Sequence, residues 1–141
     1  MKTRLITLAA LIFVLSLGLV SAAQAQTSPN PTVTLLNPPA GGELHLAVGE
    51  SYTFQIQVTS DVEFINVIAA PDPYYPGRAI SAQGNEVAHS DTSAYLELTI
   101  TGKASTADLG DGFTPFSVMV GVRYQAGEVF PFGFPMNIYV S

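Results

Sequence analysis

The sequence predicts an all-β fold, an antiparallel Greek-key sandwich of about seven or eight strands. Three observations lead to this prediction. Apolar residues recur at every second position in several segments, as in strands with one buried face. Glycine and proline separate these segments at intervals of roughly ten residues, which leaves little room for helices. No segment after residue 25 shows the apolar period of about 3.6 residues that marks an amphipathic helix. A small β-barrel is the alternative architecture.

The first 25 residues are predicted to be a helical secretory signal peptide. Lys2 and Arg4 precede the uncharged apolar run 5–20, and the small residues Ala23 and Ala25 frame a cleavage site. We expect cleavage after Ala25, although cleavage after Ala23 also fits the pattern. An uncleaved membrane anchor is the alternative, because the run approaches the length that spans a bilayer. A cleaved leader would make the protein secreted or periplasmic, with no stable membrane span.

Composition supports one domain and excludes some partners. Removing 25 of the 141 residues leaves 116, the size of a single domain. The leader holds two of the five basic residues and no acid, so eleven acids remain against three bases, a net charge of −8. This balance argues against nucleic acid and anionic lipid as partners. The chain has no cysteine, which excludes disulfides, thiol catalysis and a lipidated cysteine. We expect a leader at 1–25, a flexible linker at 26–31 and the sandwich at 32–141.

The first three strands are predicted before residue 60. Segment 32–37 is expected to be an edge strand, because the prolines that follow it would interrupt a central ladder. A second short strand is expected at 43–48, before a Gly-Glu turn. Segment 51–59 alternates cleanly and is predicted to bury the side chains of Tyr52, Phe54, Ile56 and Val58.

The middle of the chain is less regular. Segment 63–70 is nearly all apolar and β-branched, which predicts a central strand. Three prolines in 71–77 predict a loop. Two short strands, 78–80 and 86–89, are expected on either side of a turn at Gln83, Gly84 and Asn85. Segment 95–101 alternates again.

The last two strands form the clearest hairpin. Segment 116–124 places Phe116, Val118, Val120, Val122 and Tyr124 on one face. After a turn at 125–128, the final strand places Phe130, Phe132, Phe134, Met136, Ile138 and Val140 on one face. We expect these phenylalanines to be core residues rather than an exposed sticky patch. Pro131 and Pro135 should break the hydrogen-bond ladder, so this strand is predicted to be an edge or bulged strand with one side unpaired.

Two stretches resemble known modules. Residues 46–58, LAVGESYTFQIQV, resemble the opening of many bacterial and archaeal immunoglobulin-like modules, in which a Gly-Glu turn precedes the second strand. Residues 112–124, GFTPFSVMVGVRY, with the strand that follows, are similar to the closing hairpin of CARDB-type and surface-layer-associated modules. The resemblance implies an immunoglobulin-like sandwich with an extracellular adhesion, spacer or ligand-presenting role. It assigns no binding residue.

The loop at 72–78 is the strongest candidate for binding. Tyr74 and Tyr75 are flanked by prolines, and Arg78 adds a planar cation with several donors. Rigid aromatic side chains are typical of protein interfaces and can also stack on sugar rings. The alternative is that the tyrosines pack over one end of the sandwich.

Metal sites have weaker support. Asp108 and Asp111 could offer oxygen ligands to calcium, but their segment lacks the third acid and the distal glutamate of an EF-hand loop. Aspartate and glycine are also common in ordinary loops. The two histidines, His45 and His89, could bind zinc or copper with nearby carboxylates such as Glu43 or Asp91, but their spacing does not require them to meet.

No segment carries a catalytic motif. The serines lie in turns without a G-x-S-x-G nucleophile elbow. We therefore expect a non-enzymatic, exported module that presents loops or a strand edge to a protein or a cell-envelope glycan, with no cofactor apart from the calcium hypothesis. The alternatives are a carbohydrate-binding module that uses the Tyr74 and Tyr75 loop, and a calcium-stabilised structural domain.

Overall fold

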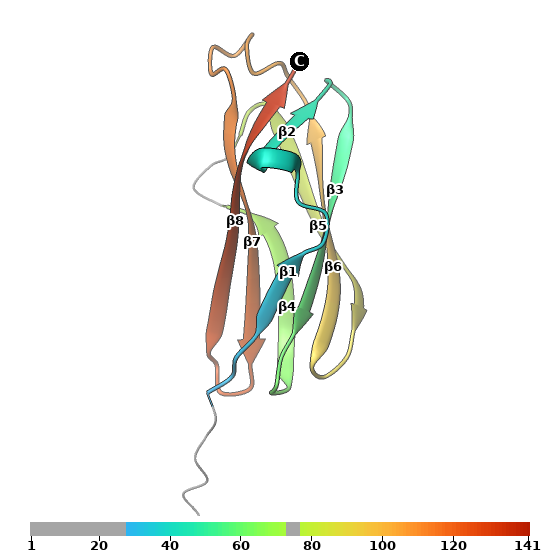
Figure 1. The fold of residues 1–141 in the computed structure, drawn as a ribbon, viewed down its shortest axis with the longest axis vertical. Coiled ribbons are helices and arrows are strands. Elements are labelled where there is room, and N and C mark those ends of the chain that lie inside the picture. The colour runs from blue at the N-terminus through green and yellow to red at the C-terminus, as the bar shows by residue number, and fades with distance from the viewer. Residues whose placement is uncertain (1–27, 73–76) are drawn as a thin grey trace, which may run out of the picture.

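Eight strands form two packed sheets in the computed structural model, which describes residues 28–72 and 77–141 (Figure 1). The strands and one short 3-10 helix follow each other as β1 (Thr32–Leu35), η1 (Ala40–Gly42), β2 (Glu43–Leu46), β3 (Ser51–Thr59), β4 (Phe64–Pro71), β5 (Ile80–His89), β6 (Ser93–Gly102), β7 (Thr114–Tyr124) and β8 (Val129–Val140). The predicted sandwich is confirmed, and the alternative of a small barrel is not, because the strands form two separate sheets. The predicted leader lies outside the described residues. Within them, no helix has the length and hydropathy needed to cross a membrane.

The order of the strands is that of an immunoglobulin sandwich. One sheet, sheet A, has the order β1-β3-β6-β5, and the other, sheet B, has the order β2-β8-β7-β4. These match the ABED and GFC sheets of an immunoglobulin constant-type domain, with β2 added beside the last strand. Every pair is antiparallel except β2 with β8, which is parallel.

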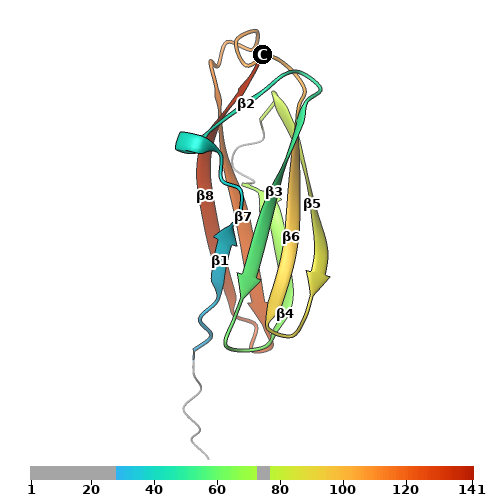
Figure 2. The ribbon, with the colours of Figure 1, turned by 45° about the vertical axis from the view of Figure 1, so that its right-hand side comes forward.

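The chain changes sheets between β1 and β2 (Figure 2). After β1 the side chain of Asn37, in place of its backbone, bonds to β3. Its Nδ2 donates to the carbonyl of Thr53 at 2.8 Å, and its Oδ1 accepts from the Gln55 N–H at 2.7 Å. Two prolines and η1 then redirect the backbone, and Gly41 and Gly42 adopt φ values of 65° and 72° that favour glycine. Leu44 and Leu46 thereby reach the inner face of sheet B.

The inner faces of the two sheets form the core, as expected for an aligned sandwich. Phe54 of sheet A stacks on Phe116 of sheet B, with ring centroids 6.2 Å apart. The largest fully buried side chains are Phe54, Ile56, Leu96, Leu98, Ile100, Ile138, Val58, Val118, Val120 and Val122. The faces predicted for β3 and β7 are therefore confirmed. The three phenylalanines of β8 are half-buried and pack against this core.

The prolines of β8 lie on an unpaired side of that strand. The Tyr124 N–H donates to the Glu128 carbonyl at 3.0 Å, so even-numbered residues of β8 bond to β7 and odd-numbered residues face away. Pro131 and Pro135 are odd-numbered. β8 is neither the edge strand nor the bulged strand that was predicted, because it lies between β2 and β7 with an unshifted register. β2 pairs with 137–140, so among the described residues the part of β8 that carries the prolines has one unpaired side, as predicted. The expectation that Pro131 and Pro135 break the hydrogen-bond ladder was wrong, because the backbone nitrogens of both prolines lie on the side of β8 that faces away from β7.

Two predictions for the middle of the chain were wrong. β4 is an edge strand of sheet B and not a central one, because β7 pairs with it on one side only. The predicted turn at Gly84 does not form, and β5 runs unbroken through it. A Cβ built on Gly84 would overlap the carbonyl oxygen of Ala69 on β4. The glycine is there because the edges of the two sheets approach closely at this point.

Candidate functional site

The structure brings together two of the predicted site residues. Arg78 Nη2 lies 3.6 Å from Asp111 Oδ2, and the two side chains are 72% and 53% exposed. Asp108 is exposed, and its backbone N–H donates to Ser105 Oγ at 3.3 Å. Tyr74 and Tyr75 lie outside the described residues, so their role stays a prediction. Within 28–72 and 77–141, no three His, Cys, Asp or Glu side chains gather as metal ligands would.

The loop that carries both aspartates is built around the buried Thr106. Its hydroxyl lies 3.0 Å from the Gly112 carbonyl, to which it donates, and it accepts from the Val140 N–H at 3.4 Å. The Asp111 N–H donates to the Thr106 carbonyl at 3.0 Å. These bonds hold the loop against the end of β8. The guanidinium of Arg78 pairs with the carboxylate of Asp111 and would compete with a metal cation for it.

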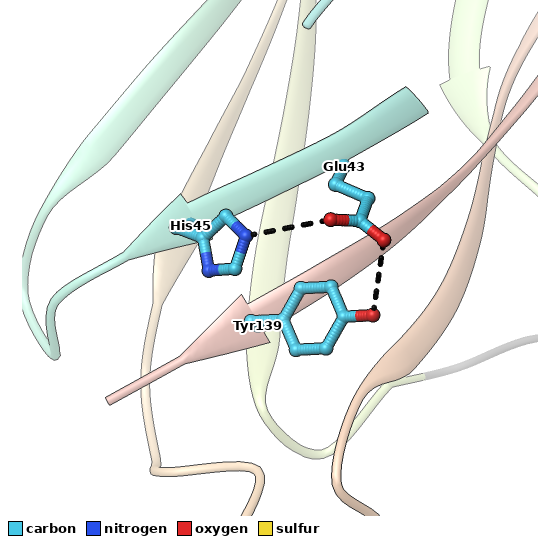
Figure 3. Close-up of polar contacts among 3 residues, drawn as sticks. All are labelled: Glu43, His45 and Tyr139. Carbon is cyan, nitrogen blue, oxygen red and sulfur yellow. Dashed lines mark hydrogen bonds and ion pairs between the residues drawn. The ribbon is translucent and has the colours of Figure 1, made fainter. Parts of the chain in front are cut away.

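A cluster of three polar and aromatic side chains stands on the outer side of β2 and β8 (Figure 3). The imidazole of His45 stacks on the ring of Tyr139, with centroids 4.6 Å apart and planes 8° from parallel. Glu43 contacts both of them: its Oε2 lies 3.8 Å from His45 Nε2, and its Oε1 accepts from the Tyr139 hydroxyl at 3.5 Å. The carboxylate therefore holds the polar tips of the two rings.

Parallel pairing of β2 with β8 creates this cluster. The register sets Glu43 opposite Asn137 and His45 opposite Tyr139, so side chains of both strands alternate outward together. Phe113, just before β7, extends the row, with its ring centroid 5.9 Å from that of Tyr139. The stack covers one face of each of these two rings.

His89 does not join His45. It lies on β5, in the other sheet, where its ring packs edge-on against Phe64 with centroids 5.1 Å apart. Its Nδ1 lies 3.4 Å from Glu86 Oε1, so its nearby carboxylate is Glu86 and not the predicted Asp91. The metal hypothesis for a histidine pair therefore has no geometric basis.

The cluster adjoins a largely apolar surface, the outer face of sheet B. Ile68 on β4 is 56% exposed and points away from the core. The outward positions of the four strands are Ile68, Ala70, Pro115, Ser117, Met119, Gly121, Arg123, Val129, Pro131, Gly133, Pro135, Asn137, Tyr139, Glu43 and His45. Among these positions only Glu43 and Arg123 carry a formal charge. A hollow of about 540 Å³ lies over Ser117 and Gly133.

The outer face of sheet A is an internal comparison, and it is polar. Most of its outward positions are polar: Thr32, Thr34, Ser51, Thr53, Gln55, Gln57, Thr59, Ser81, Gln83, Asn85, Ser93, Tyr95, Glu97, Thr99 and Thr101. Val87, 51% exposed, and Ala88 are the apolar exceptions, where β5 bulges. Hydroxyl pairs cross its central strands, at 2.8 Å between Thr53 and Thr99. A solvated sheet face normally looks like this one. Sheet B departs from the pattern, and exposed apolar faces of this kind mark interaction sites.

Sequence reasoning missed both the cluster and this face. Strand alternation gave the outward positions of β8, but Glu43 and Asn137 are far apart in the chain, and no local signal sets their register. The apolar outward residues of β4 did give a signal. The sequence prediction interpreted them as the mark of a central strand.

Comparisons with known proteins found likenesses only among solved structures. No protein-family model and no curated protein matches the chain. The BIgI domain of beta protein from S. agalactiae, solved bound to CEACAM1, is 16% identical with a TM-score of 0.43, over 81% of this chain and 99% of that one. Domains 4 and 5 of the S-layer protein SbsC are 12% identical with a TM-score of 0.45, over 80% of this chain and 53% of that one. Murine CRIg is 10% identical with a TM-score of 0.37, over 79% and 98%.

Proposed function

We propose that the protein is a non-enzymatic, exported binding module that docks another protein through the outer face of sheet B. One observation carries the proposal. Sheet A has a mostly polar outer face, whereas the equivalent face of sheet B exposes isoleucine, valine, proline and glycine. Burying such a surface against a partner removes apolar area from water, at roughly 25 cal/mol per Å².

The chemistry of the face indicates what the partner looks like. The outward side chains at its centre are uncharged, so the partner is expected to present apolar side chains there. The hollow over Ser117 and Gly133 is also lined by Asp72 and Asn137, so a polar or basic group of the partner is expected over it. Glu43 lies on β2 and Glu128 in the turn between β7 and β8, against the single base Arg123 on these strands. The whole sequence is acidic, at −6. A partner with basic residues around an apolar centre complements this distribution, and long-range attraction would speed its association.

Matched lysine variants test the proposal. Ile68→Lys places a charge on the outer face of sheet B, and Gln57→Lys places the same charge on the outer face of sheet A. Both positions are exposed, so both variants should fold. Each would be immobilised beside the wild-type protein and exposed to the secreted and envelope proteins of the source organism, with the captured proteins quantified by mass spectrometry.

The proposal expects a protein that wild type and Gln57→Lys retain in equal amounts and that Ile68→Lys loses about tenfold or more. That protein should also elute at raised ionic strength, because salt screens the charged rim. Equal retention by Ile68→Lys, or no retained protein, contradicts docking at this face.

The glycan alternative at Tyr74, Tyr75 and Arg78 stays a prediction. Its test is tyrosine fluorescence across a glycan panel, compared between wild type and a Tyr74→Ala, Tyr75→Ala double variant. A glycan-dependent shift that the double variant loses would support it, and no shift with any glycan would remove it.

A further inference from the structure

Strand β1 has one side with which no strand of the described residues pairs. The Leu36 N–H donates to the Gln55 carbonyl at 2.8 Å, which continues the antiparallel register of β1 with β3. Even-numbered residues of β1 therefore bond to β3, and the N–H and C=O groups of Val33 and Leu35 point the other way. Among the described residues, sheet A ends at this side of β1.

A groove of about 470 Å³ lies along this side. Val33, Thr34 and Leu35 form one wall, and 133–136 of β8 form the other. Pro38 and Pro39 stand at the end where the chain crosses to sheet B. None of the lining side chains is charged. Phe134, on the far wall, is half-buried and packs against the core, so the groove reaches apolar surface that continues into the interior.

The two walls differ in what they can bond. On β8, the odd-numbered residues of the wall are Gly133 and Pro135, and Pro135 has no N–H to donate. Prolines of this kind protect an edge against strand pairing. β1 has neither a proline nor a charged side chain between Thr32 and Leu35. Val33 and Leu35 therefore both offer a donor and an acceptor on the β1 wall, whereas on the β8 wall Gly133 alone keeps a donor.

We propose that this groove binds an extended segment of a partner protein, which pairs with the free side of β1. The segment donates to the C=O groups and accepts from the N–H groups of Val33 and Leu35, as an added strand does. Its inward side chains, at every second position, are apolar and contact Leu35, Phe134 and Met136. It carries no proline and no charge at those positions. This site adjoins the outer face of sheet B and shares Gly133 and Pro135 with it, but pairing with β1 does not depend on docking at that face.

The test uses displayed linear peptides long enough to span β1, selected against the purified protein. Enriched peptides should be proline-free, with apolar residues at alternate positions. Val33→Pro removes the N–H that faces the groove and leaves the bonds to β3 intact, because Val33 does not donate to β3. Val33→Thr is the matched control, with similar volume and the N–H retained. Selected peptides should bind Val33→Thr like wild type and Val33→Pro about tenfold or more weakly.

A second variant keeps the proposal open to refutation if Val33→Pro fails to fold. Thr34→Lys adds a charged side chain at an exposed position of this edge strand. Charged side chains on the edge strands of natural proteins prevent pairing with further strands. It should also weaken peptide binding about tenfold. Failure to enrich peptides, or unchanged binding to both variants, overturns the proposal. Sedimentation equilibrium should show a monomer, and a dimer that Thr34→Lys abolishes would overturn it by identifying a second copy as the occupant.

Discussion

Gly84 on β5 lies so close to Ala69 on β4 that a methyl group on the glycine would overlap the alanine carbonyl oxygen. This contact joins the edge strands of the two sheets and closes that side of the sandwich. Gly84→Ala should lower the free energy of unfolding by about 2 kcal/mol, because the two backbones must separate. Urea denaturation measures the change.

Gly121 on β7 is the matched control. A Cβ built there has only a Val129 methyl group within contact range, at 3.9 Å. Gly121→Ala should leave stability unchanged or raise it by about 0.5 kcal/mol, through the smaller entropy of the unfolded chain. Equal effects of the two substitutions would show that the approach at Gly84 does not constrain the fold.

The His45 and Tyr139 stack should appear as a coupling energy. His45→Ala, Tyr139→Ala and the double variant form a cycle in which we expect about 0.5–1 kcal/mol of interaction, typical of aromatic cross-strand pairs. Additivity within about 0.3 kcal/mol would contradict the stack, since that is the scatter of independent sites.

Thr106 should depend on its hydroxyl rather than on its size. Thr106→Val keeps the volume but leaves the Gly112 carbonyl and the Val140 N–H without this partner. We expect a loss of about 1–3 kcal/mol. Thr106→Ser keeps the hydroxyl, and it should cost less than the valine variant. The reverse order would mean that packing of the methyl group dominates.

The prolines of β8 should matter for solubility. Replacing Pro131 and Pro135 with threonine returns two donors to the free side of the strand. The double variant should keep its native far-ultraviolet circular dichroism and aggregate faster than wild type in light scattering. An unchanged aggregation rate would mean that another feature protects this edge.

Calcium should not stabilise the protein. Arg78 already pairs with Asp111, and a calcium ion would have to displace it. A site exposed to calcium at a hundred times its dissociation constant would add about 2.7 kcal/mol, which shifts the melting temperature by several degrees. We expect equal melting curves in calcium and in chelator. A calcium-dependent rise that Asp108→Asn abolishes would restore the calcium hypothesis.

Local alternation was enough to predict most of the sandwich. The buried faces of β3 and β7 follow from residues two apart, and the unpaired side of β8 follows from the placement of Pro131 and Pro135. These features depend on chemistry within one strand, which the sequence displays directly.

The features that were missed depend on contacts between distant segments. Gly84 looks like a turn residue until β4 is placed beside it, and the apolar outward side chains of β4 look like those of a central strand until sheet B is assembled. The stack of His45 on Tyr139 needs the register of β2 on β8, which no neighbouring residue specifies. Side-chain periodicity gives faces, but it does not give strand order.

The position of β8 between β2 and β7 also limits the order in which the strands can pair during folding. All four strands of sheet A lie before residue 103, so a nascent chain can complete that sheet early. β2 has no neighbour in its own sheet until the C-terminal strand is made, and such non-local pairing is slow to form. In that interval the inner faces of β4 and β7 stay partly uncovered. The late intermediate, more than the finished protein, is where a chaperone or an aggregate would compete for this chain.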